Sequence, residues 1–213
     1  MLRIWGRKNS INVQKAMWAV GELGLAHERI DVGGPFGGLD APDFLAMNPH
    51  RRIPVLQDGD VVVWESNAII RYLASQYGQG GLWPASVADR ALADAWMDWM
   101  QTTLYPDFIK VFWGLVRTPP SKRDMDAIGK ANQRVGDSFR VLDESLGARA
   151  HVVGNSLTMG DIPLGATLYR YFTLDIERPS LPAVARMYAA MLERPAYREH
   201  VAFSYEDLRA KDD

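Results

Sequence analysis

The stretch RRIPVLQDGDVVVWESNAII, residues 51–70, decides the fold because it combines two strands, a tight turn and the start of a helix. Residues 55–57 and 61–64 are apolar runs separated by Asp-Gly-Asp, and Asp-Gly between apolar runs is a strong β-hairpin signal. Ser66 then stands where a helix N-cap is expected, before apolar residues at helical spacing that end at Gly78. The stretch therefore predicts a β-β-α unit.

The residues before this unit predict a β-α-β-α arrangement. Residues 2–5 form a strand-like run, a helix follows from about Ser10, and residues 28–32 form a second strand-like run. GGPFGG, residues 33–38, is expected to be an irregular loop, followed by a short helix that Pro42 opens. The complete order, β-α-β-α-β-β-α in fewer than 80 residues, predicts one mixed sheet with helices packed on its faces.

The remainder of the chain has a helical pattern throughout. Residues 78–87, GQGGLWPASV, are rich in glycine and proline and predict a linker. The predicted domains are therefore residues 1–79 and residues 88–213. One long helix of the second domain presents a single apolar stripe, made of Ile128, Ala131, Val135, Phe139, Leu142 and Leu146.

Prolines mark the expected breaks in this helical domain. A long helix is predicted from Ala88 to about Tyr105, with a kink at Pro106. A later helix starts near Pro182 and is expected to end before Pro195, because proline disfavours a helical conformation in the residue that precedes it.

The stretch SLTMGDIPLG, residues 156–165, predicts a capped helix start. Thr158 can cap the helix, and Asp161 stands three residues later, where a capping-box side chain reaches back to the cap residue. Leu157 and Ile162 are spaced to form the flanking hydrophobic staple.

The totals of the chain exclude several classes of protein. It has 213 residues and a net charge of −2, so bulk electrostatics give no reason to expect a nucleic-acid or membrane partner. It has no cysteine, which excludes disulfides, thiolate metal sites and a protein-thiol nucleophile, and its four histidines are too scattered for a metal site. The N-terminus lacks the pattern of a signal peptide and no run approaches about 18 apolar residues, so a cytoplasmic protein is expected.

Four motifs, in this order, resemble those of the cytosolic glutathione S-transferases, and the resemblance covers essentially the whole chain. NPHRRIPVL resembles the family's strand entry, where a valine or isoleucine precedes a cis-proline, and WESNAII resembles its acid-serine helix start. SLTMGDIPLG is similar to the capping box of its helical domain, and WMDWMQTTL to the long helix of the theta class. The resemblance, greatest to theta-like and nu-like bacterial members, implies an α/β plus all-α fold: a thioredoxin-like N-terminal domain with a mixed four-stranded sheet, then an all-helical domain.

The resemblance implies that the opening stretch binds glutathione. The backbone of Ile53, before the cis-Pro54, pairs with the cysteinyl backbone of the tripeptide like an added strand. Ser66 and the free N–H groups of its helix receive the γ-glutamyl carboxylate at the positive end of the helix dipole. Glu65 faces the ammonium group of the peptide, and Arg52 meets its glycyl carboxylate. Taken alone, these residues have plainer interpretations as a helix start and a solvated arginine pair.

The resemblance also provides two catalytic candidates, Ser10 and Asn12, within NSINVQK, residues 9–15. In theta-like members a serine at this point hydrogen-bonds the sulfur of glutathione, and in nu-like members a threonine holds the place with an asparagine two residues later. A free thiol has a pKa near 8.5, and one hydrogen bond to a charged acceptor can lower it by roughly one to two units. Without the family, Ser10 is an ordinary N-cap and Asn12 a polar residue of the first helical turn.

The helical domain supplies the remaining candidates. By its spacing, Asp94 aligns with a theta-class acid that reaches across a dimer to the γ-glutamyl ammonium of the second glutathione; its other interpretation is an exposed helix carboxylate. Two or three aromatic residues, Trp113 among them, are expected to line an apolar pocket for an electrophile. The aromatic candidates are Tyr105, Phe108, Trp113, Tyr169, Tyr171 and Phe172.

The function that the resemblance implies is that of a homodimeric glutathione transferase, with glutathione as co-substrate and no metal. The glutathione thiolate attacks an apolar electrophile held against the helical domain. Two alternatives stay open. One is a glutathione-dependent disulfide or peroxide reductase, which needs no protein cysteine but requires room for two glutathiones. The other is a carrier with the transferase fold that has lost turnover.

Overall fold

The computed structural model of the protein describes residues 1–212, and its N-terminal part is built on one four-stranded sheet. The order across the sheet is β2 (His27–Ile30), β1 (Leu2–Trp5), β3 (Val55–Asp58) and β4 (Val61–Trp64). β1 pairs in parallel with β2 and antiparallel with β3, and β3 and β4 form the predicted hairpin. The mixed sheet expected from the sequence is confirmed.

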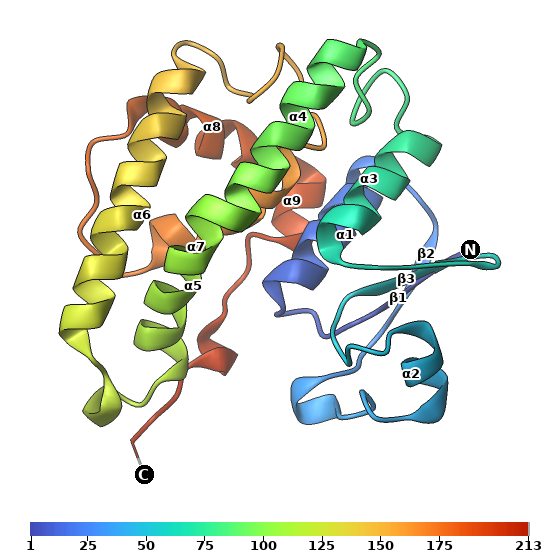
Figure 1. The fold of residues 1–213 in the computed structure, drawn as a ribbon, viewed down its shortest axis with the longest axis horizontal. Helices are drawn as coiled ribbons and strands as arrows, with labels where there is room; N and C mark the ends of the chain where they lie inside the picture. Colours follow the sequence, from blue (N-terminus) through green and yellow to red (C-terminus); the bar gives the residue numbers. More distant parts are fainter. Residues whose placement is uncertain (213) are drawn as a thin grey trace.

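Helix α1 (Ile11–Glu22) lies at the centre of the molecule. It packs against α3 (Ser66–Tyr77) beside the sheet, and it also meets α7 (Asp161–Thr173) and α9 (Pro195–His200) of the helical part (Figure 1). Every residue from 13 to 20 is buried, so α1 has no solvent-facing stripe over this length. Because both parts of the molecule pack on α1, its N-terminus is fixed where they meet.

The rest of the chain is helical, as expected, and the predicted stripe on α6 is buried along its whole length. No helix within residues 1–212 is long and apolar enough to cross a membrane. The division of the chain at residues 79 and 88 stays a prediction. The further helices are α2 (Pro42–Met47), α4 (Val87–Trp99), α5 (Tyr105–Phe112), α6 (Met125–Leu146) and α8 (Pro182–Leu192), with π-helical segments η2 (Met100–Leu104) and η3 (Trp113–Arg117) and 3-10 turns η1 (Gly34–Phe36), η4 (Pro120–Lys122) and η5 (Glu206–Leu208).

The structure corrects two local expectations and adds a short helix. The long helix changes its hydrogen bonding before Pro106 and not at it, because η2 is π-helical and Pro106 falls in the first turn of α5. The loop expected to be irregular at residues 33–38 contains the 3-10 turn η1. Helix α8 runs from Pro182 to Leu192 and so ends before Pro195 as predicted, and Pro195 opens the short helix α9, which was not predicted.

The capping box predicted at the start of α7 is present in altered form. Asp161 is fully buried and accepts a hydrogen bond from the Thr158 N–H at 2.8 Å, which is the backward contact expected from the sequence. Its other carboxylate oxygen accepts from the Val152 N–H at 2.9 Å, and the Thr158 hydroxyl donates to Asp161 at 3.1 Å. Leu157 and Ile162 are both buried in the core beside it. Asp161 therefore fastens the preceding loop to α7.

Candidate active-site cleft

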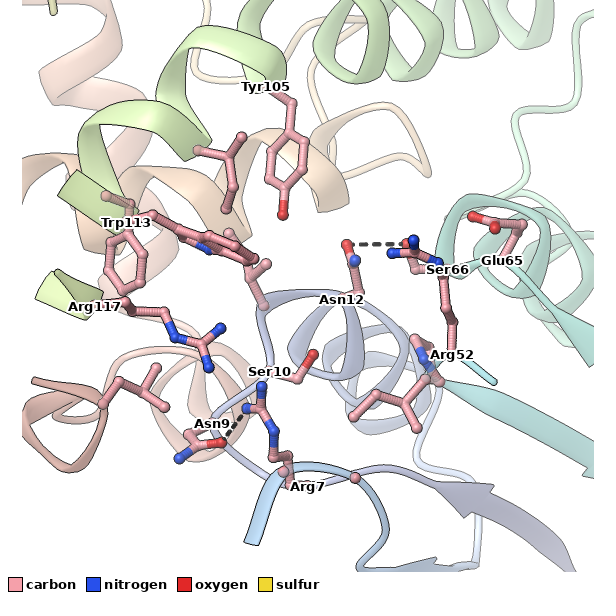
Figure 2. A pocket seen from close by; sticks show the side chains of 18 of the residues that line it. Arg7, Asn9, Ser10, Asn12, Arg52, Glu65, Ser66, Tyr105, Trp113 and Arg117 are labelled. Carbon is pink, nitrogen blue, oxygen red and sulfur yellow. Dashed lines mark hydrogen bonds between the residues drawn. The ribbon is translucent and has the colours of Figure 1, made fainter. Parts of the chain in front are cut away.

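A cleft of about 530 Å³ lies where the two parts of the molecule meet, at the N-terminus of α1 (Figure 2). One side is formed by the loop before α1, by residues 51–54 and by the start of α3, and the other by η2, α5 and η3. This is the carboxyl end of β1, the edge at which open α/β sheets bind ligands. The predicted residues that line the cleft are Ser10, Asn12, Arg52, Ile53, Pro54, Glu65, Ser66, Tyr105 and Trp113.

Ser10 and Asn12 present polar groups to the middle of the cleft. Ser10 is the N-cap of α1 by its extended backbone, yet its hydroxyl makes no capping hydrogen bond. The hydroxyl is therefore available to a ligand. The Oδ1 of Asn12 accepts a hydrogen bond from the Ser66 hydroxyl at 3.4 Å. With its oxygen engaged, the Asn12 amide offers the cleft its Nδ2 group, which can only donate.

The start of α3 differs from the expected serine cap. Glu65 occupies the N-cap position with a φ of +71°, a conformation that residues other than glycine rarely adopt and that is often found at functional sites. Ser66 is the first helical residue and is buried, and no side chain caps this helix end. Within residues 1–212, the first N–H groups of α3 thus have no side-chain acceptor, and together with the helix dipole they favour an anion.

The segment before β3 brings backbone groups and one cation to the same cleft. The Ile53–Pro54 peptide bond is cis, and Pro54 is buried while Ile53 is half-buried. Among residues 1–212, no backbone hydrogen bond of a turn, loop or cap uses the N–H or C=O of Ile53. Arg52 is exposed on the cleft wall, and the neighbouring Arg51 forms an ion pair with Asp40 at 2.9 Å. Arg52 is therefore the arginine of this pair that is left for a ligand.

The apolar wall contains some of the predicted aromatic residues and excludes others. Tyr105 and Trp113 line it, and Trp113 is 53% exposed. Phe108 is fully buried in the core, and Tyr169 packs edge-on against Tyr205 outside the cleft, which corrects the expected place of both. Two further aromatic candidates, Tyr171 and Phe172, pack in or against the core and do not line the cleft.

Five apolar lining residues were not predicted: Ile11, Leu39, Ile109, Phe112 and Leu208. Helical spacing shows which residues of a helix share a face, but it does not show which face meets the other part of the molecule. Leu208 comes from the C-terminal turn η5, and no pattern in the sequence connects this turn with the distant segment η3. The backbone tie between them is the hydrogen bond from the Ala210 N–H to the Val116 carbonyl at 2.7 Å.

Three arginines that sequence reasoning missed also line the cleft: Arg7 from the loop before α1, Arg117 from η3 and Arg170 from α7. Arg170 is almost completely buried, and its Nη2 donates to the Asn9 carbonyl at 2.8 Å and to the Gln14 side chain at 3.3 Å. Burial lowers the pKa of Arg170 to about 10, so the group stays charged near neutral pH. A signal existed only for Arg7, which lies two residues after the end of the first strand, at the sheet edge where ligands bind.

Asp94 lies outside this cleft. Its carboxylate accepts from Arg71 Nε at 2.6 Å, and Arg71 also pairs with Asp98 at 2.7 Å, so the three residues join α3 to α4. Its predicted contact with a second protomer stays a prediction. Within residues 1–212, the structure contains no group of histidine and acidic side chains that could hold a metal ion.

Comparisons of the sequence with known families match both parts of the chain. Residues 1–75 match the model of the glutathione S-transferase N-terminal domain, and residues 92–195 match that of the C-terminal domain. The chain is 42% identical over 203 residues to the glutathione S-transferase GstB of Escherichia coli K12, covering 94% of this chain and 98% of the relative. It is also 29% identical to glutathione S-transferase D6 of Drosophila melanogaster, covering 93% of this chain and 91% of the relative.

Solved structures show the same similarity. The theta-class glutathione S-transferase of Xanthomonas axonopodis pv. citri, with glutathione bound, superposes with a TM-score of 0.91 and 46% identity, covering 95% of this chain and 98% of that one. A glutathione transferase of Bombyx mori, BmGSTD1, superposes with a TM-score of 0.86 at 23% identity, covering 97% and 95% of the two chains, which supports the fold alone.

Proposed function

Because the chain belongs to the glutathione S-transferase family, we propose that it binds glutathione in this cleft and stabilises the thiolate for attack on an electrophile. The observation that carries the proposal is the convergence of Ser10, Asn12 and Ser66 on one cleft, from helix starts that lie far apart in the sequence. The similarity to a theta-class transferase with glutathione bound supports it.

The two ends of the cleft fit the two ends of the tripeptide. The γ-glutamyl carboxylate binds at the start of α3, where the Ser66 hydroxyl and free backbone N–H groups donate to it. Glu65 faces the ammonium group, and Arg52 faces the glycyl carboxylate. Between them, the free N–H and C=O of Ile53 pair with the cysteinyl backbone in the manner of an added strand. These contacts deliver the sulfur to the N-terminus of α1.

At that position the protein lowers the pKa of the thiol. The Ser10 hydroxyl and the Asn12 Nδ2 group donate hydrogen bonds to sulfur, and the positive end of the α1 dipole adds to their effect. Each donor favours the thiolate over the thiol, because a hydrogen bond to the charged form stabilises it. Neither residue has to remove the proton, which solvent accepts. The thiolate is the nucleophile.

The second substrate and the assembly follow from the surfaces around the sulfur site. Tyr105, Phe112 and Trp113 provide an apolar wall against which an electrophile packs. We propose a homodimer because β4, α3 and α4 expose large apolar side chains, namely Trp64, Tyr77, Val87 and Leu92. A cytoplasmic location stays a prediction.

The test is the ultraviolet difference absorbance of glutathione bound to the protein, followed against pH. We expect thiolate absorbance to appear well below the free thiol pKa of about 8.5. Ser10→Ala and Asn12→Ala, made singly, should each raise the apparent pKa of bound glutathione by roughly one unit, with affinity nearly unchanged. If both variants titrate like the wild type, the assignment of the thiolate donors is wrong.

A second variant separates binding from activation. Ser66→Ala should weaken glutathione binding about three- to tenfold, because it removes one donor to the γ-glutamyl carboxylate. Ser75→Ala is the matched control, since Ser75 lies on the same helix with its hydroxyl bonded to the Tyr72 carbonyl, away from the cleft. Saturable binding with an unshifted thiol pKa would instead favour a carrier that has lost turnover.

A further inference from the structure

The side of the cleft that faces the electrophile carries a surplus of positive charge. Arg7, Arg117 and Arg170 lie there, whereas Glu65 is the one acidic residue among the described residues that line the cleft. Within residues 1–212, none of the three arginines forms an ion pair with a carboxylate. The glutathione placed above engages Arg52 and the start of α3, so these three cations are left without an anion.

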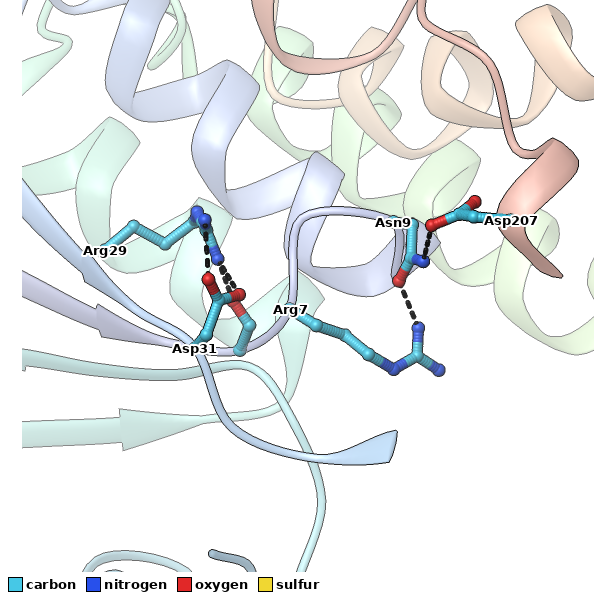
Figure 3. A network of polar contacts seen from close by, with 6 residues as sticks. Arg7, Asn9, Arg29, Asp31 and Asp207 are labelled. Carbon is cyan, nitrogen blue, oxygen red and sulfur yellow. Dashed lines mark hydrogen bonds and ion pairs between the residues drawn. The ribbon is translucent and has the colours of Figure 1, made fainter. Parts of the chain in front are cut away.

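Arg7 is held in place by a neutral side chain. Its Nη1 donates to the Asn9 Oδ1 at 2.6 Å, and the Asn9 amide in turn donates to Asp207 (Figure 3). Arg29, close by, pairs directly with Asp31. Asp207 thus orients Arg7 through an intervening amide and does not neutralise it by contact. Burial and the charge of Arg117 both lower the pKa of Arg7, while the charge of Asp207, which makes no direct contact with the guanidinium, opposes this change.

Arg117 and Arg170 are held by aromatic rings. The Arg117 guanidinium carbon lies 5.0 Å from the centre of the Trp113 ring, and that of Arg170 lies 4.4 Å from the centre of the Phe112 ring. An aromatic face orients a guanidinium without removing its charge. Figure 2 shows Arg7 and Arg117 on the same side of Ser10 as Trp113, away from Glu65 and Ser66.

We propose that the electrophile is itself an anion: a flat apolar body that packs on Trp113, carrying a carboxylate that binds between Arg7 and Arg117. Arg7 and Arg117 repel each other, and neither forms a direct ion pair with a carboxylate within residues 1–212, so a bound carboxylate offsets that repulsion with charge-assisted hydrogen bonds. The buried charge of Arg170 adds attraction at longer range. The inference rests on the proposed function and narrows its substrate class.

The reaction is illustrated by 4-chloro-3,5-dinitrobenzoate. The glutathione thiolate forms a carbon–sulfur bond at ring carbon 4, the carbon–chlorine bond breaks, and chloride leaves with the electron pair. The proton released when the thiol ionised remains in solvent. The carboxylate takes no part in bond making, so any effect of it on the rate, after correction for intrinsic reactivity, reports recognition by the protein.

The experiment compares this compound with its neutral methyl ester. For each, kcat/KM is divided by the uncatalysed rate constant with glutathione, which removes the difference in intrinsic reactivity. We expect the wild-type protein to favour the carboxylate by about tenfold or more, the effect of one charge-assisted hydrogen bond. Equal corrected values for the two compounds would overturn the proposal.

Variants show which residue causes the preference for the carboxylate over the ester. Arg117→Gln should lower the carboxylate-to-ester ratio about tenfold, and Arg117→Lys should keep part of it, because the charge remains but the two-pronged geometry is lost. Arg90→Gln is the matched control: Arg90 also lies over a tryptophan, 5.4 Å from the centre of the Trp83 ring, but outside the cleft, so the ratio should not change. If Arg117→Gln lowers both rates alike, the arginines serve the thiolate and the proposal fails.

Binding without turnover keeps the two proposals separate. Titration calorimetry with 3,5-dinitrobenzoate and its methyl ester, which have no leaving group, measures the site in the presence and absence of glutathione. Tighter binding of the anion, weakened by Arg117→Gln, supports the proposal even if neither chlorinated compound reacts. Equal binding of anion and ester overturns it. Absence of thiolate absorbance from glutathione bound to the wild-type protein, by contrast, counts against the proposed function.

Discussion

Lys15 is the residue whose surroundings differ most from those its chemistry favours. It lies on α1 with no solvent exposure, and its Nζ has no hydrogen-bond partner within residues 1–212. The ammonium group lies 5.1 Å from the centre of the Tyr105 ring, which attracts a cation but does not replace water. Burial lowers the pKa of Lys15 to about 7, although the charge of Glu65 opposes this change.

The lowered pKa of Lys15 has a defined effect on stability. Below about pH 7 the folded and unfolded chains both hold the proton, so the full cost of burying the charge is present. As pH rises from about 7 towards the ordinary value of 10.5, the folded protein releases the proton while the unfolded chain keeps it, and stability increases. A pKa difference of one between the two states corresponds to roughly 1.4 kcal/mol of stability.

Lys15→Met should therefore stabilise the protein at low pH and progressively less at high pH. We expect the free energy of unfolding to rise by about 1–3 kcal/mol at pH 6, because the buried charge is removed while the side-chain volume is kept. Thermal and denaturant unfolding at pH 6 and pH 9 measure the difference, with Lys130→Met, at an exposed position on α6, as the control. An identical gain at both pH values would contradict this account.

At the scale of single residues, the polar side chains at helix starts could be predicted from the sequence. Of the arginines discussed in the cleft, Arg52 was predicted and Arg7, Arg117 and Arg170 were not. Ser10, Asn12 and Ser66 stand at helix starts, and the pattern of caps and apolar residues locates helix starts well. Arg117 stands near the end of a helical segment, where an arginine is ordinary, and its place on the cleft depends on how η3 turns towards α1. No spacing rule encodes that turn.

Among the elements, the loop before α7 depends most on one side chain. Asp161 satisfies two buried backbone N–H groups, those of Val152 and Thr158, and it does so with charge, which makes the hydrogen bonds stronger. Helix α7 begins at Asp161, after both of these residues in the sequence. The carboxylate therefore connects the preceding loop to the first turn of α7.

Asp161→Asn should test this directly. The amide matches the carboxylate in shape but has a single acceptor oxygen, so one buried N–H loses its partner. We expect a loss of roughly 2–4 kcal/mol in the free energy of unfolding. Asp126→Asn, an exposed acidic residue in the first turn of α6, is the control and should change stability by no more than about 0.5 kcal/mol. Equal effects of the two would show that Asp161 acts only through the helix dipole.

The elements themselves could largely be read from the sequence. The bounds predicted for β4 coincide with those observed, because an Asp-Gly turn marks the hairpin. Helix α3 ends before Gly78 as predicted, although its N-cap is Glu65 and not Ser66. The features that escaped include the π-helical segments η2 and η3 and the helix α9. A π-helical turn has no composition signal, and a helix as short as α9 is stabilised by packing against α1 more than by its own residues.

For the whole molecule, the exposed apolar residues around α4 predict where a second copy binds. Leu92 is 55% exposed on α4, next to the Arg71–Asp94 pair that joins α3 and α4. Leu92→Glu should shift the protein from dimer to monomer, because it places an unpaired charge in the interface. Val141→Glu, at a residue 54% exposed on α6, is the matched control and should leave the assembly unchanged. Light scattering after size-exclusion chromatography distinguishes the two masses, and a wild-type monomer would rule the interface out.

The hydrogen bond between Ser66 and Asn12 joins recognition to activation. In the free protein this contact holds the Asn12 amide with its Nδ2 group facing the cleft. The same Ser66 hydroxyl donates to the γ-glutamyl carboxylate when glutathione binds, so the γ-glutamyl group holds the sulfur at the Asn12 amide. Cysteinylglycine, which lacks the γ-glutamyl group, should therefore react with a lower kcat and not only a higher KM. Equal kcat values for the two thiols would sink this expectation. On this view shorter thiols can enter the cleft but react more slowly, because only the complete tripeptide holds its sulfur at the donor groups.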